Sequence, residues 1–300
     1  MPLGHMLRRL RVELLENRKM VGHEQMEHTS FGGQWTLEKL DILERYLDAY
    51  TTALKSKPFN LIYIDAFAGS GSINLSTDIK NFIKGSADRA VEIDDKPFDQ
   101  IIFVENNQDR CRELENLKSN NLDRDIQIQN LDANQFLGSF QQDWAQCRGV
   151  LFLDPFATEV EWSTIKRIAG FNALDTWILF PISAITRMLP RSKKPDDISS
   201  QWVQRLGKVF GDESWRELYR ENPQQDMFGH IGHERDPGVN GLLAIYKRNL
   251  EQLFGNRFLN KSRTLKNSKN SALFEFLFCV GNPNGVPVAK GIASHILRKI

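Results

Sequence analysis

The sequence has few cysteines and no long apolar run. Its three cysteines, Cys111, Cys147 and Cys279, are too few and too scattered for a disulfide framework or a cysteine zinc site. No stretch approaches the about 18 uninterrupted apolar residues of a membrane-spanning helix, and the amino-terminal segment lacks the apolar part and cleavage site of a signal peptide. We therefore expect a cytoplasmic protein with no membrane partner.

Net charge is also nearly absent. The 300 residues carry 39 Lys and Arg against 38 Asp and Glu, a formal charge of +1. Any affinity for nucleic acid must then come from local basic clusters. No Walker-type phosphate loop or Ser-His-Asp arrangement stands out, and His230-Ile-Gly-His233-Glu234 lacks a clear third and fourth ligand, so no metal site is predicted.

The most informative stretch is a buried-strand pattern that runs into an acid and a glycine turn. Residues 61–64 are apolar, which places Asp65 at the carboxyl end of a central parallel strand, the edge where open α/β sheets bind ligands. Gly69 and Gly71 would let the backbone pass close to a ligand. The third glycine of a dinucleotide fingerprint is missing, and an acid repels a pyrophosphate but attracts an ammonium or sulfonium group. The stretch thus favours S-adenosylmethionine as the cofactor.

Strands and helices alternate through the first two thirds of the chain. The patterns predict a helix over 36–54 with Thr36 as its N-cap, strands at 60–65, 100–104, 126–130, 150–153 and 176–180, and helices at about 86–95, 108–119, 133–145 and 161–170. A helix at about 240–254 follows, and a strand at 271–280 with a turn into 286–288 reads as a terminal hairpin. The predicted fold is α/β, a doubly wound, mostly parallel seven-stranded sheet of the class I S-adenosylmethionine-dependent methyltransferase type, with a helical insertion after strand five.

Three parts of the chain are predicted from this pattern. Residues 1–34 form an amino-terminal segment, of which 1–6 resemble the remnant of an expression tag. Residues 35–186 and 241–300 form the Rossmann-like domain. Residues 187–240, rich in charge, Pro, Gly, Gln and Asp, form the insertion, a candidate substrate-recognition subdomain.

Acidic residues follow four of the predicted strands. Asp65, Glu105, Asp132 and Asp154 should all lie at the ligand edge of the sheet. Glu105 has two acceptor oxygens for the two hydroxyls of a ribose, and Asp132 could accept from an adenine amine. Each acid alone could be a solvated strand end or a helix cap, but four in register favour a shared cofactor site.

Asp154-Pro155-Phe156 is the candidate for chemistry. In enzymes that methylate an exocyclic amino nitrogen, an acid, a proline-region carbonyl and an aromatic ring at this position hold the amine and stack on the base. The motif of those enzymes reads Asp or Asn, two prolines and an aromatic residue, and its second proline is absent here. The alternative is that Asp-Pro only ends the strand and Asp154 caps the turn.

Together these residues resemble the three-Cys-motif partner protein family, over roughly residues 28–290. The resemblance implies a methyltransferase-like Rossmann fold more firmly than an activity, and it implies a protein partner encoded nearby. Ala157 stands where the family usually has glycine, and the acid-proline-aromatic form is also similar to that of the tRNA guanine-N2 dimethyltransferases. The stretches that carry the resemblance are 36–47, 63–71, Gly85-Ser86, 103–105 and 153–156, with Phe31-Gly32-Gly33 similar to an amino-terminal motif of adenine methyltransferases.

Two basic clusters are candidate substrate sites. The first contains Arg187, Arg191, Lys193 and Lys194, and the second contains Arg257, Lys261, Arg263, Lys266 and Lys269. Either could neutralise phosphates, with Trp202 and Trp215 as stacking surfaces, or could be an ordinary solvated loop.

Our first hypothesis is a methyltransferase acting on adenine N6 or guanine N2 in nucleic acid. Asp154, Pro155 and Phe156 would position the acceptor, and the first basic cluster would bind the substrate. The cofactor would be held by Lys39, Asp65, Phe67, Gly69, Gly71, Glu105 and Asp132. The alternatives are a catalytically silent module that binds nucleic acid or a protein, and a methyltransferase for proteins or small molecules.

Overall fold

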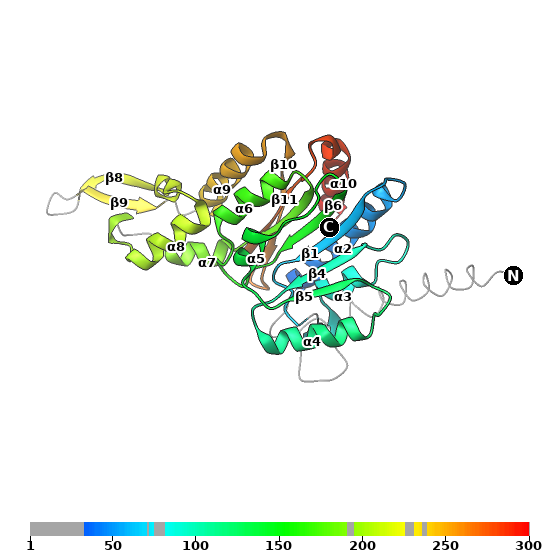
Figure 1. Ribbon diagram of the computed structural model, residues 1–300. Coiled ribbons are helices and arrows are strands. Elements are labelled where there is room, and N and C mark those ends of the chain that lie inside the picture. Colours follow the sequence, from blue (N-terminus) through cyan, green and yellow to red (C-terminus); the bar gives the residue numbers. More distant parts are fainter. Residues whose placement is uncertain are drawn as a thin grey trace.

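Seven strands form one sheet with helices on both faces in the computed structural model (Figure 1). The structure describes residues 33–70, 72–74, 82–190, 195–225, 231–235 and 239–299, and the side chains of these except 72–74, 82–83, 220–225, 231–235 and 239. Five strands are parallel: β1 (Asn60–Asp65), β4 (Gln100–Val104), β5 (Ile126–Gln129), β6 (Cys147–Leu153) and β7 (Leu174–Phe180).

The last two strands of the sheet break the parallel pattern. β11 (Ala272–Cys279) lies antiparallel between β7 and the edge strand β10 (Phe258–Lys266). The resulting order is β10-β11-β7-β6-β1-β4-β5. This is the strand order of the class I S-adenosylmethionine-dependent methyltransferase fold, so the predicted fold class is confirmed.

Strand register determines which residues meet at the ligand edge. β1 lies between β4 and β6, and Asp65 is level with Phe103 on one side and with Phe152 on the other. Glu105 and Asp154 therefore each lie two residues after the residue that is paired with Asp65 on their own strand. These strands are buried along nearly their whole length because their apolar residues face helices on both sides.

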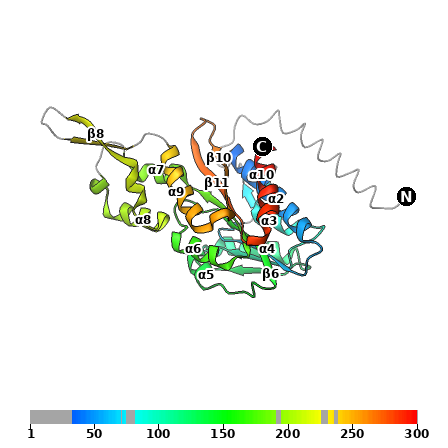
Figure 2. The same ribbon diagram turned by 90° about the horizontal axis from the view of Figure 1, so that it is seen from above.

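Two separate cores lie on the two faces of the sheet. One packs beneath α2 (Gln34–Leu54), α3 (Ser86–Val91), α4 (Gln108–Ser119) and α10 (Val286–Lys299). The other packs beneath α5 (Ala133–Ser139), α6 (Trp162–Phe171), α7 (Ile182–Met188) and α9 (Val239–Phe254). Figure 2 shows α2 and α10 together on one side of the sheet and α5 and α6 on the other.

A buried hydrogen-bonded group ties α2 to the sheet. The Tyr46 hydroxyl donates to Asp175 Oδ2 of β7 at 2.6 Å, and the Gly281 N–H donates to Asp175 Oδ1 at 2.7 Å. Burial raises the pKa of Asp175 to about 6, against the lowering effect of these two hydrogen bonds. One carboxyl group thus joins α2, β7 and the chain that follows β11.

The predicted terminal hairpin was wrong in its second strand. Residues 286–288 begin α10, and the partner of β11 is β10. Proline is tolerated in the first turn of a helix, where its missing N–H has no partner to lose, so Pro287 does not prevent α10. Thr36 is also not the N-cap: α2 begins at Gln34, and the Thr36 N–H donates to the carbonyl of the N-cap Gly33.

Smaller differences concern lengths and loops. α3 and α5 end at Val91 and Ser139, before the predicted 95 and 145. The predicted loop after Gly71 contains a short hairpin of β2 (Ser72–Asn74) and β3 (Phe82–Lys84).

The segment beyond α7 contains helical elements that pack into the core of the sheet and a hairpin that extends away from the sheet (Figures 1 and 2). Its elements are α8 (Ser200–Phe210), a 3-10 turn at Ser214–Leu218, and the antiparallel strands β8 (Tyr219–Gln225) and β9 (Ile231–Arg235). Trp215 is fully buried, so its predicted stacking role is wrong, whereas Trp202 is 42% exposed. The domain boundaries at 34, 186 and 240 stay predictions. Among the described residues, no helix is both long and apolar enough to span a membrane.

Candidate functional site

A cleft of about 770 Å³ opens at the carboxyl ends of the parallel strands. Nine of the predicted site residues line it: Lys39, Phe67, Gly69, Glu105, Asp132, Asp154, Pro155, Phe156 and Arg187. Gly71, Arg191, Lys193 and Lys194 lie outside the residues that the structure describes, as do the side chains of His230 and His233. The four elements that follow β1, β4, β5 and β6 thus meet in one space.

Asp65 lies behind the cleft wall and not on its surface. Its side chain has no exposed area, and it accepts from the Phe67 N–H at 3.3 Å and from the Ser86 hydroxyl. Burial raises the pKa of Asp65 to about 7, and nearby Asp154 raises it further, while the hydrogen bonds and Lys39 lower it. The expectation that Asp65 touches the cofactor directly is therefore not met. Asp65 instead holds the backbone turn that carries Phe67 to the cleft.

Glu105 joins this turn to the loop after β4. Its Oε2 accepts from the Gly69 N–H at 3.0 Å, and its Oε1 accepts from the Asn107 N–H at 2.8 Å. Gly69 has φ +65°, a left-handed conformation that glycine adopts without strain, and this turns its N–H toward the carboxylate. The Arg110 guanidinium lies 3.8 Å from Oε2. The carboxylate is thus held rigidly at the cleft.

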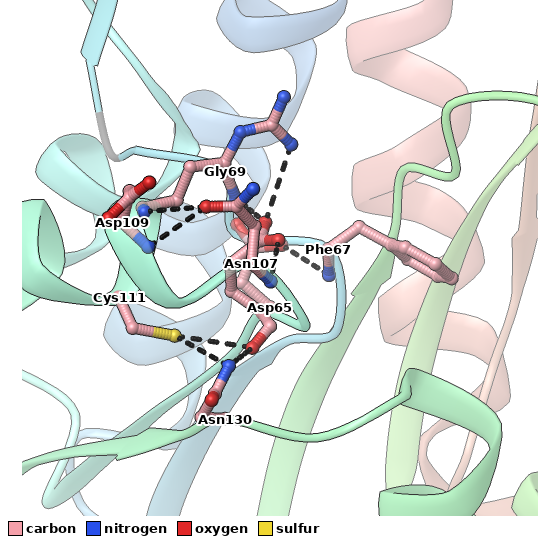
Figure 3. A network of polar contacts seen from close by, with 9 residues as sticks. Asp65, Phe67, Gly69, Asn107, Asp109, Cys111 and Asn130 are labelled. Carbon is pink, nitrogen blue, oxygen red and sulfur yellow. Dashed lines mark hydrogen bonds and ion pairs between the residues drawn. The ribbon is translucent and has the colours of Figure 1, made fainter.

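A second set of contacts supports the backbone of Glu105. Its carbonyl accepts from Asn130 Nδ2 at 2.9 Å and from the Cys111 thiol at 3.2 Å. Figure 3 shows the side chains of Cys111 and Asn130 pointing toward one another, with the ring of Phe67 directed away from them. Burial raises the pKa of Cys111, which keeps this thiol protonated as a donor.

Asp132 is both a helix cap and a cleft residue. It is the N-cap of α5, and its Oδ1 accepts from the Gln135 N–H at 3.0 Å. The side chain is exposed and lines the cleft. The capping alternative and the binding hypothesis are therefore compatible, because capping occupies one carboxylate oxygen.

Asp154 forms an ion pair with Lys39 across the cleft. The Lys39 Nζ contacts Asp154 Oδ2, and the exposed fractions of the two side chains are 8% and 19%. The ammonium also lies 5.3 Å from the centroid of the Trp35 ring. The first turns of α2 are thereby fixed against the loop after β6.

The loop after β6 is held by Asn134 of α5. Asn134 Nδ2 donates to the Glu159 carbonyl at 2.8 Å, and its Oδ1 accepts from the Glu161 N–H at 3.0 Å and the Thr164 hydroxyl at 2.8 Å. Within the loop, the Ala157 N–H donates to Glu159 Oε2 at 2.6 Å. These bonds fix the backbone that carries Asp154 to Phe156.

The outer wall of the cleft combines an aromatic ring with a cation. Phe156 is 83% exposed although it is a large apolar side chain, and Pro155 beside it is buried. Arg187, in the last turn of α7, is exposed at the same cleft. A planar ring and a guanidinium at one opening can contact a base and a phosphate.

The second basic cluster is largely engaged in structural contacts. Arg257 donates to the carbonyls of Ala169 at 3.2 Å and Gly281 at 2.9 Å, and Arg263 pairs with Glu38. This cluster is a weaker candidate for phosphate binding than the sequence indicated, because its arginines hold the fold together.

Several cleft residues were missed from the sequence. Trp35 and Phe274 line the cleft with ring centroids 5.1 Å apart, and Arg110 and Ser86 also line it. Trp35 adjoins the predicted helix start, so its position could have been noted. Phe274 gives no such signal, because it lies in a strand whose other phenylalanines are core residues.

Comparison with known proteins gives structural likeness only. No family model and no curated protein matches the chain. Protein LPL1258 of Legionella pneumophila, assigned to the family model DUF519, is 11% identical, covers 87% of this chain and 91% of its own, and has a TM-score of 0.48.

Two further solved structures are methyltransferase-related by their descriptions. An S-adenosylmethionine-dependent methyltransferase from Clostridium acetobutylicum is 10% identical, covers 80% of this chain and 92% of its own, and has a TM-score of 0.36. TYW2 of M. jannaschii, solved in complex with AdoMet, is 9% identical, covers 80% and 74%, and has a TM-score of 0.34. The fold assignment rests on the strand order described above and not on these values.

Proposed function

We propose that the protein is an S-adenosylmethionine-dependent methyltransferase that acts on an exocyclic amino nitrogen of a nucleic-acid base. The observation that carries the proposal is the cleft itself. It brings Glu105 and Asp132, suited to a nucleoside, into the same space as Asp154, Pro155 and Phe156. Acceptor and cofactor could therefore lie side by side for an in-line transfer.

The residues present fit the cofactor. A carboxylate offers about four acceptor positions, and the two N–H donors on Glu105 leave room for the two hydroxyls of a ribose. The second oxygen of Asp132 can accept from an amine. When bound, S-adenosylmethionine supplies an electrophilic methyl group.

The other half of the cleft suits a base with an amino group. Asp154 can accept an N–H of that amine, which turns the nitrogen lone pair toward the methyl group. The exposed ring of Phe156 can stack on the base plane, a contact worth about 1–3 kcal/mol per base. Arg187 can pair with a neighbouring phosphate.

The setting proposed for this activity is the cytoplasm. All three cysteines are buried and free, as a reducing compartment allows. The resemblance to the three-Cys-motif partner proteins remains part of the proposal, and with it a protein partner encoded nearby.

Two measurements test the proposed function. Calorimetry should show binding of S-adenosylmethionine and none of NAD. Tritiated methyl transfer to total RNA, total DNA and total protein should then label nucleic acid, and Asp154→Ala should abolish the label, while Asp123→Ala, at an exposed site outside the cleft, should leave it unchanged.

Each alternative has its own outcome in these measurements. Cofactor binding without transfer to any substrate would indicate the silent module. Label in protein alone would indicate a protein methyltransferase. Equal labelling by Asp154→Ala would remove Asp154 from the mechanism.

A further inference from the structure

Lys39 is a buried cation that, among the described residues, forms an ion pair with the carboxylate of Asp154. Its side chain is 8% exposed, its ammonium contacts Asp154 Oδ2, and the face of Trp35 lies 5.3 Å away. A charge removed from water is costly unless it is paired, so the position of this ammonium depends on Asp154.

The helix that carries Lys39 is firmly anchored. Ile42, Leu43 and Tyr46 of α2 are fully buried against the sheet, and Tyr46 is bonded to Asp175. Because α2 is anchored to the sheet, the ion pair with Lys39 restricts the position of Asp154. The two residues are 115 positions apart in the sequence, so the contact depends on the complete fold.

The pair leaves half of the carboxylate for another partner. Lys39 occupies Oδ2, and no hydrogen bond to Oδ1 comes from the residues that the structure describes. Asp154 lines the cleft beside the exposed Phe156. A carboxylate fixed in this way can only accept hydrogen bonds, so it suits a donor such as an amine and disfavours a carbonyl oxygen or an unprotonated ring nitrogen.

We propose that Lys39 is the positioning residue of Asp154 and not a ligand of the cofactor, and that the pair selects substrates that present an N–H donor. The proposal rests on the methyltransferase function proposed above. It replaces the expectation that Lys39 orients S-adenosylmethionine.

A stability cycle tests the pair without any need for activity. Lys39→Met keeps the length of the side chain and removes its charge, which leaves Asp154 without its cation. The melting temperature should fall in this variant, and Asp154→Asn in the same chain should restore at least about half of that loss. Additive effects of the two substitutions would show that the pair is not coupled and would overturn the proposal.

Cofactor binding separates positioning from ligation. Lys39→Met should bind S-adenosylmethionine with a Kd within about threefold of the parent protein. A rise of about 100-fold would make Lys39 a cofactor ligand and would contradict the proposal. Lys166→Met, an exposed lysine of α6, serves as the matched control for both measurements.

Transfer kinetics provide the third readout. Lys39→Met should lower kcat by about 100-fold with little change in the KM for S-adenosylmethionine, and Lys39→Arg should recover part of that loss. An unchanged kcat would contradict the positioning role. If the parent protein transfers no methyl group, the proposed function fails, while the stability cycle still decides whether Lys39 holds Asp154.

Discussion

Asp65 is a carboxyl group with no exposed surface at the end of the central strand. Burial is the main reason that its pKa is raised to about 7, from an ordinary value of 3.8. Between these two values the folded protein binds more protons at Asp65 than the unfolded chain does. The contribution of Asp65 to the free energy of unfolding therefore falls as the pH rises from about 4 to about 7.

Asp65→Asn removes this pH dependence. The amide keeps the shape of the side chain but cannot ionise, so the stability of the variant relative to the parent should improve by on the order of 2–3 kcal/mol between pH 5 and pH 8. Urea unfolding at both pH values measures this. Asp123→Asn, at an exposed site, should show a constant difference, and a constant difference for Asp65→Asn would contradict the raised pKa.

At the scale of elements, one side chain of α5 holds the far end of the loop after β6. Asn134 bonds the Glu159 carbonyl, the Glu161 N–H and the Thr164 hydroxyl. It therefore connects α5, the loop and the first turn of α6. Together with the ion pair of Asp154 at the start of the loop, these bonds hold both of its ends.

Asn134→Ala should loosen that loop. Three polar groups lose their partner, so the free energy of unfolding should fall by about 1–3 kcal/mol. Methyl transfer should fall more steeply than binding of S-adenosylmethionine, because the substitution acts on the acceptor side of the cleft. Chemical unfolding and calorimetry measure the two effects. Asn116→Ala, at an exposed position of α4, should change neither.

Most elements could be predicted because their apolar patterns are strong. Strands β1, β4, β6 and β7 each contain four consecutive apolar residues, and α4 matches its prediction at both ends. β10 was missed because it carries Lys261, Arg263 and Lys266, charges that are typical of an edge strand and obscure the strand pattern. α10 was missed because two β-branched residues around a proline, Val286-Pro-Val288, favour an extended chain, and only tertiary contacts make this segment helical.

At the scale of the whole molecule, the group around Asp175 joins three distant segments. Tyr46 of α2 and Gly281 after β11 both donate to this one carboxylate in the interior. Neither donor can be replaced by water, because Asp175 and Tyr46 are buried.

Tyr46→Phe should destabilise the protein, and more so at high pH. The lost hydrogen bond should lower the free energy of unfolding by about 1–3 kcal/mol. The same bond lowers the pKa of Asp175, which is about 6, so the cost should be larger at pH 8, where the carboxylate is charged, than at pH 5. Tyr50→Phe, one turn later on α2, is the matched control. Equal losses at both pH values would contradict the assignment.

From the sequence, only those site residues could be predicted that directly follow the parallel strands. Glu105, Asp132 and Asp154 meet because the carboxyl ends of neighbouring parallel strands share one edge. The burial of Asp65 was not predictable, because it depends on Ser86 and the turn that cover it. The pairing of Lys39 with Asp154 was equally hidden, since no local pattern links a helix to a loop so far along the chain.

The position of β11 has a consequence for biosynthesis. β11 enters between β7 and β10, and both precede it in the chain. Until residues 272–279 have left the ribosome, β7, whose seven residues are all buried in the finished fold, is an open edge that offers its N–H and C=O groups to any extended chain nearby. The edge of β7 therefore stays unpaired in the nascent chain throughout the synthesis of residues 181–271, and it can pair wrongly during that interval.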